Sequence, residues 1–133
     1  MLTEAQKRLV QDSWSLVAPI ADQATLLFYG KLFELDPALR PLFPEDLTGQ
    51  RTKLAQALGF AVGSLDRPEV LTPALQAMGR RHRDYGVQEG HYGTVGRALL
   101  WTLAEGLGPA FTPAHAEAWT ATYTWVAATM KAA

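Results

Sequence analysis

One short segment of the chain concentrates groups that could bind a metal or an anion. In GRRHRDYG, residues 79–86, His82 lies among Arg80, Arg81 and Arg83. A neutral imidazole can ligate a metal through one ring nitrogen, and guanidinium groups pair with anions through a planar fork. The ordinary alternative is a histidine that is hydrogen-bonded in the core, with arginines that solvate a helix end. The rest of the chain must decide between the two.

The other reactive side chains exclude most competing chemistries. The chain has no cysteine, and its three histidines lie far apart without the spacing of a zinc or di-iron site. Ser13, Ser15 and Ser64 lie in stretches with helical periodicity and lack the Gly-x-Ser-x-Gly context of a hydrolase nucleophile. Haem iron, by contrast, needs only one protein ligand, so a histidine beside an apolar slot is sufficient for it.

Composition indicates a globular domain. The 133 residues are 48% hydrophobic with a formal net charge of −1, which predicts one domain over 1–133 and no attraction to nucleic acid or anionic lipid. Residues 1–13 are too polar for a signal peptide, and the most apolar stretch, 55–65, is too short to cross a bilayer. We therefore expect a cytoplasmic protein that binds neither nucleic acid nor membrane.

Apolar residues recur with helical spacing, and no segment alternates with period two. The pattern predicts an all-α fold of about seven helices with short connections. Thr3 and Gln6 form a capping box, and three further helix starts are predicted at Asp36-Pro37, Thr72-Pro73 and Thr112-Pro113. Gly86 can end the helix of His82, because glycine readily adopts the left-handed conformation found at helix C-termini.

The apolar stripes predict which residues face the core. Leu26, Tyr29 and Phe33 share one face of a helix that is apolar over most of its circumference, so we expect that helix to be central. Gly59 and Gly63 weaken a later helix, which suggests close approach by another helix at both positions. The later stripes are Gln50, Leu54, Ala61 and Leu65; Leu75, Met78 and His82; Tyr92, Val95, Leu99 and Leu103; and Trp119, Tyr123, Val126 and Met130.

Several motifs are specific in combination. They are FYGKLF (28–33), DPALRPLF (36–43), Gln50 followed by Leu54, GRRHRDYGV (79–87), HYGTVG (91–96) and the AW…Y pattern at 118–123. With them, essentially the whole chain resembles the bacterial single-domain haemoglobins and is similar to the globin domain of flavohaemoglobins. This resemblance implies a globin fold around haem b, with His82 as the proximal ligand of a five-coordinate iron, Phe43 on the haem face, and a distal pocket of Tyr29, Gln50 and Leu54.

Further residues are expected to contact the cofactor. These are Lys53, Met78, Arg81, Val87, Tyr92 and Val95. Arg81 is the expected partner of a haem propionate, with Arg83 and Lys53 behind it, whereas Arg80 and Arg83 suit a solvated helix end equally well.

The proximal side departs from the flavohaemoglobin pattern. In that family a tyrosine and a glutamate form hydrogen bonds around the proximal histidine, and Tyr92 matches the tyrosine. The chain ends at Ala133, about one residue before the glutamate, so we expect weaker tuning of His82. Flavin and nicotinamide domains are also missing from the sequence, which predicts an external reductase for any redox turnover.

The distal residues leave alternatives open. The Tyr29 hydroxyl either donates into the pocket or bonds to a backbone carbonyl, and Gln50 either contributes its amide or only begins a helix. Phe43, held between prolines, either packs on a flat ligand or is ordinary core. Two preplaced donors would stabilise the partial negative charge of bound dioxygen and give high affinity, although Tyr29 or Gln50 could instead ligate ferric iron.

Two classes of function follow from these expectations. One is a binding protein that stores, delivers or senses dioxygen and also binds NO and CO. The other is a nitric oxide dioxygenase, which converts dioxygen and nitric oxide to nitrate with an external reductase. The missing reductase and glutamate favour binding, and the Tyr29 and Gln50 pair suits both. A helical module without haem is the third alternative.

Overall fold

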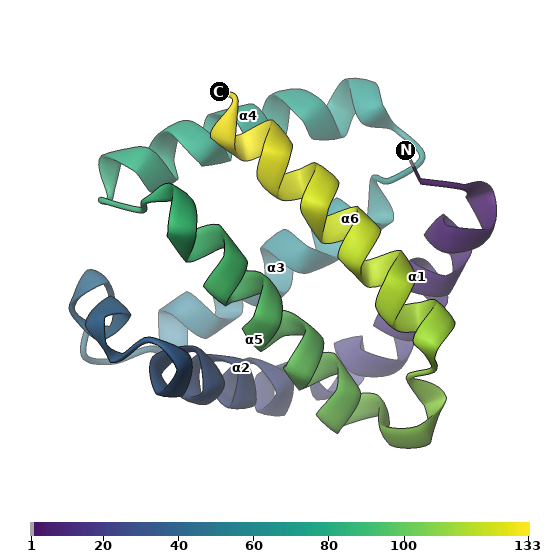
Figure 1. Ribbon diagram of the computed structural model, residues 1–133, viewed down its shortest axis with the longest axis horizontal. Helices are drawn as coiled ribbons and strands as arrows, with labels where there is room; N and C mark the ends of the chain where they lie inside the picture. The colour runs from purple at the N-terminus through teal and green to yellow at the C-terminus, as the bar shows by residue number, and fades with distance from the viewer. Residues whose placement is uncertain (1) are drawn as a thin grey trace.

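The computed structural model describes residues 2–133, and every regular element in that range is a helix (Figure 1). The prediction of an all-α fold is confirmed. The α-helices are α1 (Glu4–Val17), α2 (Ala21–Leu35), α3 (Thr48–Gly63), α4 (Pro68–Asp84), α5 (Glu89–Leu107) and α6 (Pro113–Lys131). Short 3-10 helices connect some of them: η1 (Ala18–Ile20), η2 (Pro37–Leu42) and η3 (Gly108–Ala110).

The helix expected at Asp36-Pro37 is the 3-10 segment η2, so the described residues form six α-helices rather than seven. The Asp36 carboxylate caps it by accepting the Ala38 N–H at 3.2 Å. Pro41 lies inside η2 and has no N–H to donate, which prevents a continuous α-helical ladder across this short segment.

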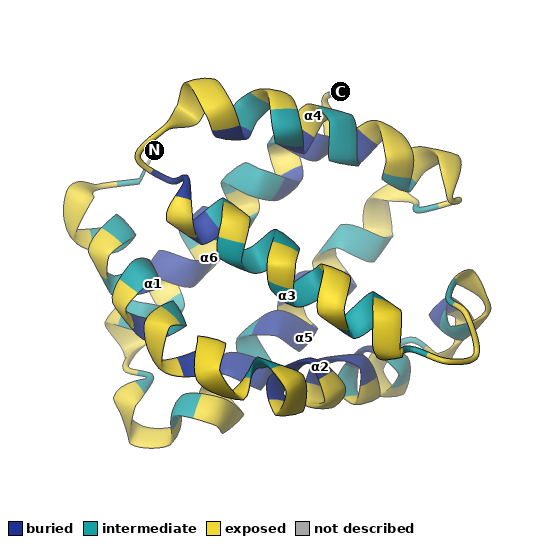
Figure 2. Ribbon diagram, turned by 180° about the vertical axis from the view of Figure 1, so that it is seen from behind, coloured by how far each residue is buried: buried dark blue, intermediate teal, exposed yellow. Residues whose placement is uncertain are grey.

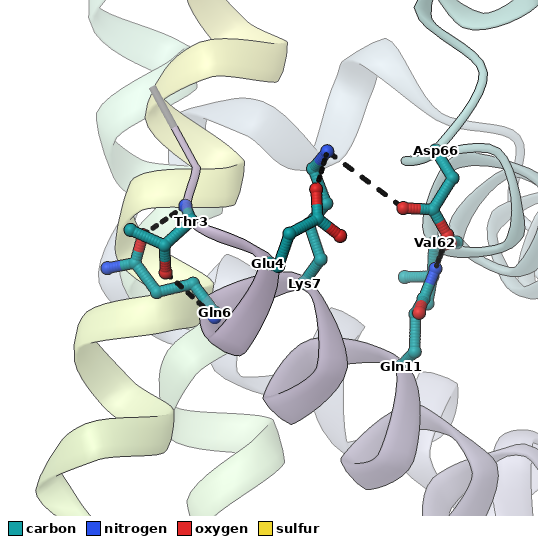
Figure 3. A network of polar contacts seen from close by, with 7 residues as sticks. All are labelled: Thr3, Glu4, Gln6, Lys7, Gln11, Val62 and Asp66. Atoms are coloured by element: carbon teal, nitrogen blue, oxygen red, sulfur yellow. Dashed lines mark hydrogen bonds and ion pairs between the residues drawn. The ribbon is translucent and has the colours of Figure 1, made fainter.

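The predicted cap at Thr3 is confirmed, and that end of α1 belongs to a network of polar contacts (Figure 3). Thr3 Oγ1 accepts the Gln6 N–H at 3.0 Å, and Gln6 Oε1 accepts the Thr3 N–H at 3.1 Å. One turn later, Gln11 Nε2 donates to the Val62 carbonyl at 3.2 Å and to the Asp66 carboxylate at 3.3 Å. This network ties α1 to the end of α3.

The cap at Thr112 is also confirmed, but the helix start predicted at Thr72-Pro73 is wrong. Thr112 Oγ1 accepts the His115 N–H at the start of α6. Pro73 lies inside α4, which begins earlier, at Pro68. Pro68 already takes the first helical position, where a missing N–H costs nothing, and the fully buried Leu71 anchors the added turn in the core.

The helices pack in pairs around a common core (Figure 2). α2 packs on α5, α6 packs on both α1 and α4, and α3 packs on α1 and α2. Trp119 of α6 is 2% exposed, and its indole N–H donates to Ser13 Oγ of α1 at 2.9 Å. No helix within residues 2–133 has both the length and the hydropathy required to cross a bilayer.

The buried face of α2 differs from the prediction. Phe28, Tyr29 and Leu32 are buried, but Leu26 and Leu27 are 59% and 44% exposed. The expectation that Leu26 shares the buried face of Tyr29 is therefore wrong. The helices that cover α2 pack against the stripe that carries Phe28 and Leu32, and they leave the opposite side to solvent.

Close helix approach occurs at different glycines from those predicted. A Cβ atom at Gly79 would overlap the Met130 backbone, so Gly79 lets α4 lie directly on α6. Gly96 similarly makes room for the Tyr123 ring. At Gly59 only the Trp14 side chain is near, and nothing lies within 4 Å of Gly63, so the prediction of close packing is wrong at Gly63.

Candidate functional site

His82 lies in the last turn of α4, where one hydrogen bond determines which ring nitrogen carries its proton. His82 Nδ1 lies 2.8 Å from the Met78 carbonyl oxygen, one turn earlier. A carbonyl oxygen can only accept, so Nδ1 must carry the proton and donate it. With its proton on Nδ1, the neutral ring has its lone pair on Nε2, which is the form of imidazole that ligates a metal.

The chain turns sharply just after His82, as the sequence predicted. Gly86 has a φ of 90°, and its N–H donates to the Arg83 carbonyl at 3.1 Å. The next N–H, that of Val87, donates to the His82 carbonyl at 3.0 Å. These two bonds and the left-handed glycine form a Schellman motif, which ends α4 and directs the chain into α5.

Apolar side chains from several elements remain only half-buried. α3 packs mainly on α1 and α2, whereas α4 packs on α6, so these two consecutive helices do not cover each other (Figure 1). The half-buried residues are Phe33 of α2, Phe43 and Leu47 after η2, Leu54 and Leu58 of α3, Met78 of α4, Val87, and Tyr92 and Val95 of α5. The helices thus leave part of this apolar surface uncovered.

Phe43 belongs to a cluster of aromatic rings that continues onto α2. Its backbone is extended, with φ −119° and ψ 154°, as expected for a residue before proline. The Phe43 ring centroid lies 5.5 Å from that of Tyr29 and 5.5 Å from that of Phe33, both in edge-to-face geometry. Phe28 also packs on Tyr29, with centroids 5.1 Å apart in edge-to-face geometry. The cluster holds Tyr29 firmly between neighbours.

Tyr29 is 3% exposed, and the side chain that acts on its hydroxyl is that of Gln50. Burial raises the pKa of the Tyr29 hydroxyl, and hydrogen bonding with the Gln50 side chain lowers this pKa in part. Within residues 2–133, no side-chain polar atom that is fully buried lacks a hydrogen-bond partner. Gln50 lies in the first turn of α3 and Leu54 one turn later.

The cations near His82 differ in what they contact. Arg80, Arg81 and Lys53 are exposed and form no ion pair within residues 2–133. The Arg83 guanidinium instead donates to the Ala133 carbonyl. Arg83 is therefore tied to the end of α6, whereas the guanidinium groups of Arg80 and Arg81 and the ammonium group of Lys53 have no such contact within residues 2–133.

Tyr92 lies half-buried in the first turn of α5. Burial raises the pKa of its hydroxyl, and the nearby Arg83 charge lowers it in part. The Tyr92 carbonyl accepts the Tyr123 hydroxyl at 2.6 Å, and Lys131 Nζ lies 5.8 Å from the centroid of the Tyr92 ring. Burial also raises the pKa of Tyr123 strongly. The C-terminal half of α6 thus holds Tyr92 in place from two sides.

The other two histidines serve as helix caps. His91 Nδ1 accepts the Gln88 N–H at 3.0 Å, and His115 Nδ1 accepts the Thr112 N–H at 3.3 Å. Among residues 2–133, no three histidine, aspartate or glutamate side chains gather into a metal site.

Sequence reasoning missed Arg40, which contacts the corner that carries Phe43. Its guanidinium donates to the backbone carbonyls of Phe43, Pro44 and Glu45. The available signal was the position of an arginine within DPALRPLFP, where prolines supply no backbone donors.

The family of this fold follows from comparison with known proteins. The family model described as Globin matches residues 26–130, a range that contains Tyr29, Phe43 and His82. The chain belongs to the globin family. The resemblance found in its sequence motifs is therefore confirmed at the level of the family.

Three relatives show how far this globin resembles known proteins. It is 34% identical over 143 residues to a Danio rerio neuroglobin, across 97% of this chain and 90% of that protein. It is 33% identical over 130 residues to a Rhodopirellula baltica flavohemoprotein, across 96% of this chain but only 32% of that protein. The globin therefore spans about a third of that relative.

The third relative is a solved structure, an engineered carbene transferase built on a proposed nitric oxide dioxygenase from Rhodothermus marinus. It superposes with a TM-score of 0.89 at 32% identity, across 99% of this chain and 92% of that chain. This globin thus shares its fold with that solved structure over 99% of its chain.

Proposed function

We propose that this globin binds haem b through His82 and uses it to bind dioxygen reversibly, for storage, delivery or sensing. The observation that carries the proposal is the hydrogen bond from His82 Nδ1 to the Met78 carbonyl, because it leaves Nε2 as a ready iron ligand. The half-buried apolar residues of α3, α4 and α5 fit the flat face of a porphyrin. When bound, haem supplies an iron that can take a diatomic ligand such as O2, NO or CO.

The distal residues suit a ligand that carries partial negative charge. The Tyr29 hydroxyl and the Gln50 amide are neighbouring donors in an otherwise apolar environment, where a hydrogen bond to charge is stronger than in water. Leu54 would form an apolar wall beside them, and Phe43 would pack against the flat face of the cofactor. Such a pocket favours dioxygen over carbon monoxide and supports high oxygen affinity.

The rim of the site supplies charges for the propionates. Arg81 lies next to His82 in α4 and is exposed, so its guanidinium can pair with a carboxylate through two hydrogen bonds. Lys53 is exposed on α3 and can supply a second cation. Met78, Val87, Tyr92 and Val95 would contact the cofactor from the proximal side.

The absorption spectrum of the purified protein tests this proposal directly. We expect a Soret band from bound haem in the wild type, and loss of stable haem binding in His82→Leu. His115→Gln is the matched control, because glutamine can keep the capping contact at that position while a histidine is still removed. A normal five-coordinate ferrous spectrum in His82→Leu would refute His82 as the ligand.

A second candidate function is nitric oxide dioxygenase activity. It is favoured by the similarity to a flavohemoprotein and to the proposed nitric oxide dioxygenase from Rhodothermus marinus. Conversion of NO and O2 to nitrate requires one electron per turnover, which a reductase would supply. Nitrate formed in excess of the haem present, under air and with a supplied reductase, would support this function; a single turnover at most would favour oxygen binding.

A further inference from the structure

The corner after η2 places three successive carbonyl groups where the backbone offers no donors. Within residues 2–133, the carbonyls of Phe43, Pro44 and Glu45 accept no backbone N–H. Pro41 and Pro44 have no N–H to offer, and α3 does not begin until Thr48. Backbone carbonyls of this kind need side chains or water as partners.

Arg40 satisfies all three carbonyls with one side chain. Its Nη1 lies 3.3 Å from the Phe43 oxygen and 3.0 Å from the Pro44 oxygen, and its Nη2 lies 2.8 Å from the Glu45 oxygen. The planar guanidinium presents several donors in a fixed arrangement, which an ammonium group cannot reproduce. Arg40 forms no ion pair within the described range 2–133, so these carbonyls are its identified polar partners.

The same guanidinium ties the corner to α2. The Arg40 Cζ atom lies 5.3 Å from the centroid of the Phe33 ring, in a cation–π contact. Phe33 packs on Phe43, and both rings pack on Tyr29 at centroid distances of 5.5–6.0 Å. Arg40 is therefore linked to Tyr29 through two aromatic neighbours.

We propose that Arg40 is a positioning residue for the distal side of this globin. By holding the corner at 43–45 and the Phe33 ring together, it keeps Phe43 against Tyr29 and so orients the Tyr29 hydroxyl beside Gln50. The inference rests on the proposed function for its ligand, dioxygen, but its contacts lie entirely within the chain. Arg40 itself is not a ligand contact; it acts through Phe43 and Tyr29.

A first experiment measures the contact between Arg40 and the carbonyls of 43–45, which we call the clamp. The method is hydrogen exchange of the purified protein. Arg40→Met keeps the length and apolar stem of the side chain but removes its donors. We expect the Phe43 amide, which donates to the Arg40 carbonyl at 3.1 Å, to exchange about tenfold faster or more in this variant, with α1 and α6 unchanged. Arg8→Met is the matched control, because Arg8 is exposed on α1 and contacts no part of the corner. Unchanged exchange of the Phe43 amide would overturn the clamp.

A second experiment tests positioning, by oxygen dissociation from the reduced haem-loaded protein. We expect Arg40→Met to accelerate dissociation by about three- to tenfold in the wild-type background and by less than about twofold in Tyr29→Phe, because the effect passes through the tyrosine hydroxyl. Arg40→Lys should accelerate it less than Arg40→Met, since one ammonium group restores only part of the contacts. If Arg40→Met does not fold, Arg40→Lys replaces it in the comparison between the wild-type and Tyr29→Phe backgrounds.

The outcomes separate this inference from the proposed function. If Arg40→Met accelerated oxygen dissociation equally in the wild-type and Tyr29→Phe backgrounds, positioning through Tyr29 would be overturned. Arg40 would then have only a structural role. An unchanged rate in folded Arg40→Met would do the same. A wild type that binds no haem would overturn the proposed function and the positioning role together, whereas the exchange experiment would still report whether the clamp exists.

Discussion

At His82, the proton on Nδ1 is donated to a backbone carbonyl 2.8 Å away rather than to a carboxylate. A carbonyl is a neutral acceptor, so it holds the ring orientation but withdraws little proton density from the imidazole. A carboxylate partner would make Nε2 a stronger electron donor. If His82 ligates haem iron as we propose, the Met78 contact would make it a ligand of moderate strength, which suits reversible gas binding better than activation of an oxygen–oxygen bond.

Resonance Raman spectroscopy of the ferrous protein measures the strength of this ligand. We expect the iron–histidine stretch at a lower frequency than in haem proteins whose proximal histidine is bonded to a carboxylate, because of the Met78 carbonyl. Replacing Tyr92 by phenylalanine should shift it only slightly, since His82 Nδ1 bonds to Met78 instead. A frequency typical of a carboxylate-bonded histidine would show that Met78 is not the partner in the haem-bound protein.

Tyr29 should control oxygen release, because its hydroxyl is a buried donor beside Gln50. A hydrogen bond to a charged acceptor is worth roughly 1.5–3 kcal/mol, so Tyr29→Phe should accelerate oxygen dissociation by about ten- to a hundredfold. Gln50→Leu should act in the same direction with a smaller effect, and carbon monoxide release should respond much less. Stopped-flow dissociation from the reduced proteins measures all of these rates.

Tyr85→Phe provides the control for this comparison. Tyr85 is 68% exposed after the last turn of α4, so its hydroxyl should have no influence on release. If Tyr29→Phe also left the rate unchanged, the hydroxyl would be bonded elsewhere in the haem protein, and the assignment of a high-affinity oxygen pocket would fail.

Among the helices, the crossing of α4 and α6 sets the position of the whole proximal side. Gly79 lies one turn before Arg83 on α4 and packs directly on the Met130 backbone. Arg83 then donates to the Ala133 carbonyl, and α6 also holds Tyr92 through Tyr123 and Lys131. The close contact at Gly79, rather than a salt bridge, thus fixes how α4, which carries His82, lies on α6.

Gly79→Ala should therefore destabilise the fold and weaken haem retention together. The added methyl group would collide with backbone atoms that cannot rotate away, which costs about 1–3 kcal/mol or more of unfolding free energy. Gly30→Ala is the control, since Gly30 is an exposed interior residue of α2 with open space around it and should gain up to about 1 kcal/mol. Urea unfolding of both variants distinguishes these opposite signs.

At the scale of the whole molecule, the buried tyrosines make the unfolding free energy depend on pH in the alkaline range. Burial raises the pKa values of Tyr29, Tyr92 and Tyr123 above the ordinary value of 10.0. A raised pKa means that the folded state holds the phenol proton more tightly than the unfolded state does. The resulting stability is present below pH 10 and is lost as the pH rises above it.

Unfolding experiments across the alkaline range test this linkage. We expect the contribution of the tyrosines to the unfolding free energy to be constant up to about pH 9 and to decrease progressively above about pH 10. Tyr123→Phe should be less stable at neutral pH, because it loses the hydrogen bond to the Tyr92 carbonyl, but its stability should fall less steeply at high pH. A variant slope as steep as that of the wild type would contradict the assignment to Tyr123.

Local rules allowed much of the fold to be predicted. The caps at Thr3 and Thr112 and the turn at Gly86 depend on groups within a few residues, and all three are confirmed. His82, Tyr29 and Phe43 were proposed from their residue types and motifs, and their roles toward haem remain predictions. The structure adds the Met78 contact of His82 and the aromatic packing around Tyr29.

The remaining features depended on which helix faces meet. The sequence alone determined the all-α class, the helix limits at Thr3, Gly86 and Thr112, and the family, because hydrophobic period, capping groups and motifs are local properties of the chain. Only the tertiary structure decided that Leu26 is exposed, that Gly79 rather than Gly63 carries a close crossing, and that Arg40 holds the Phe43 corner. Those outcomes are set by contacts with other elements, and a residue's own sequence neighbours carry little information about such partners.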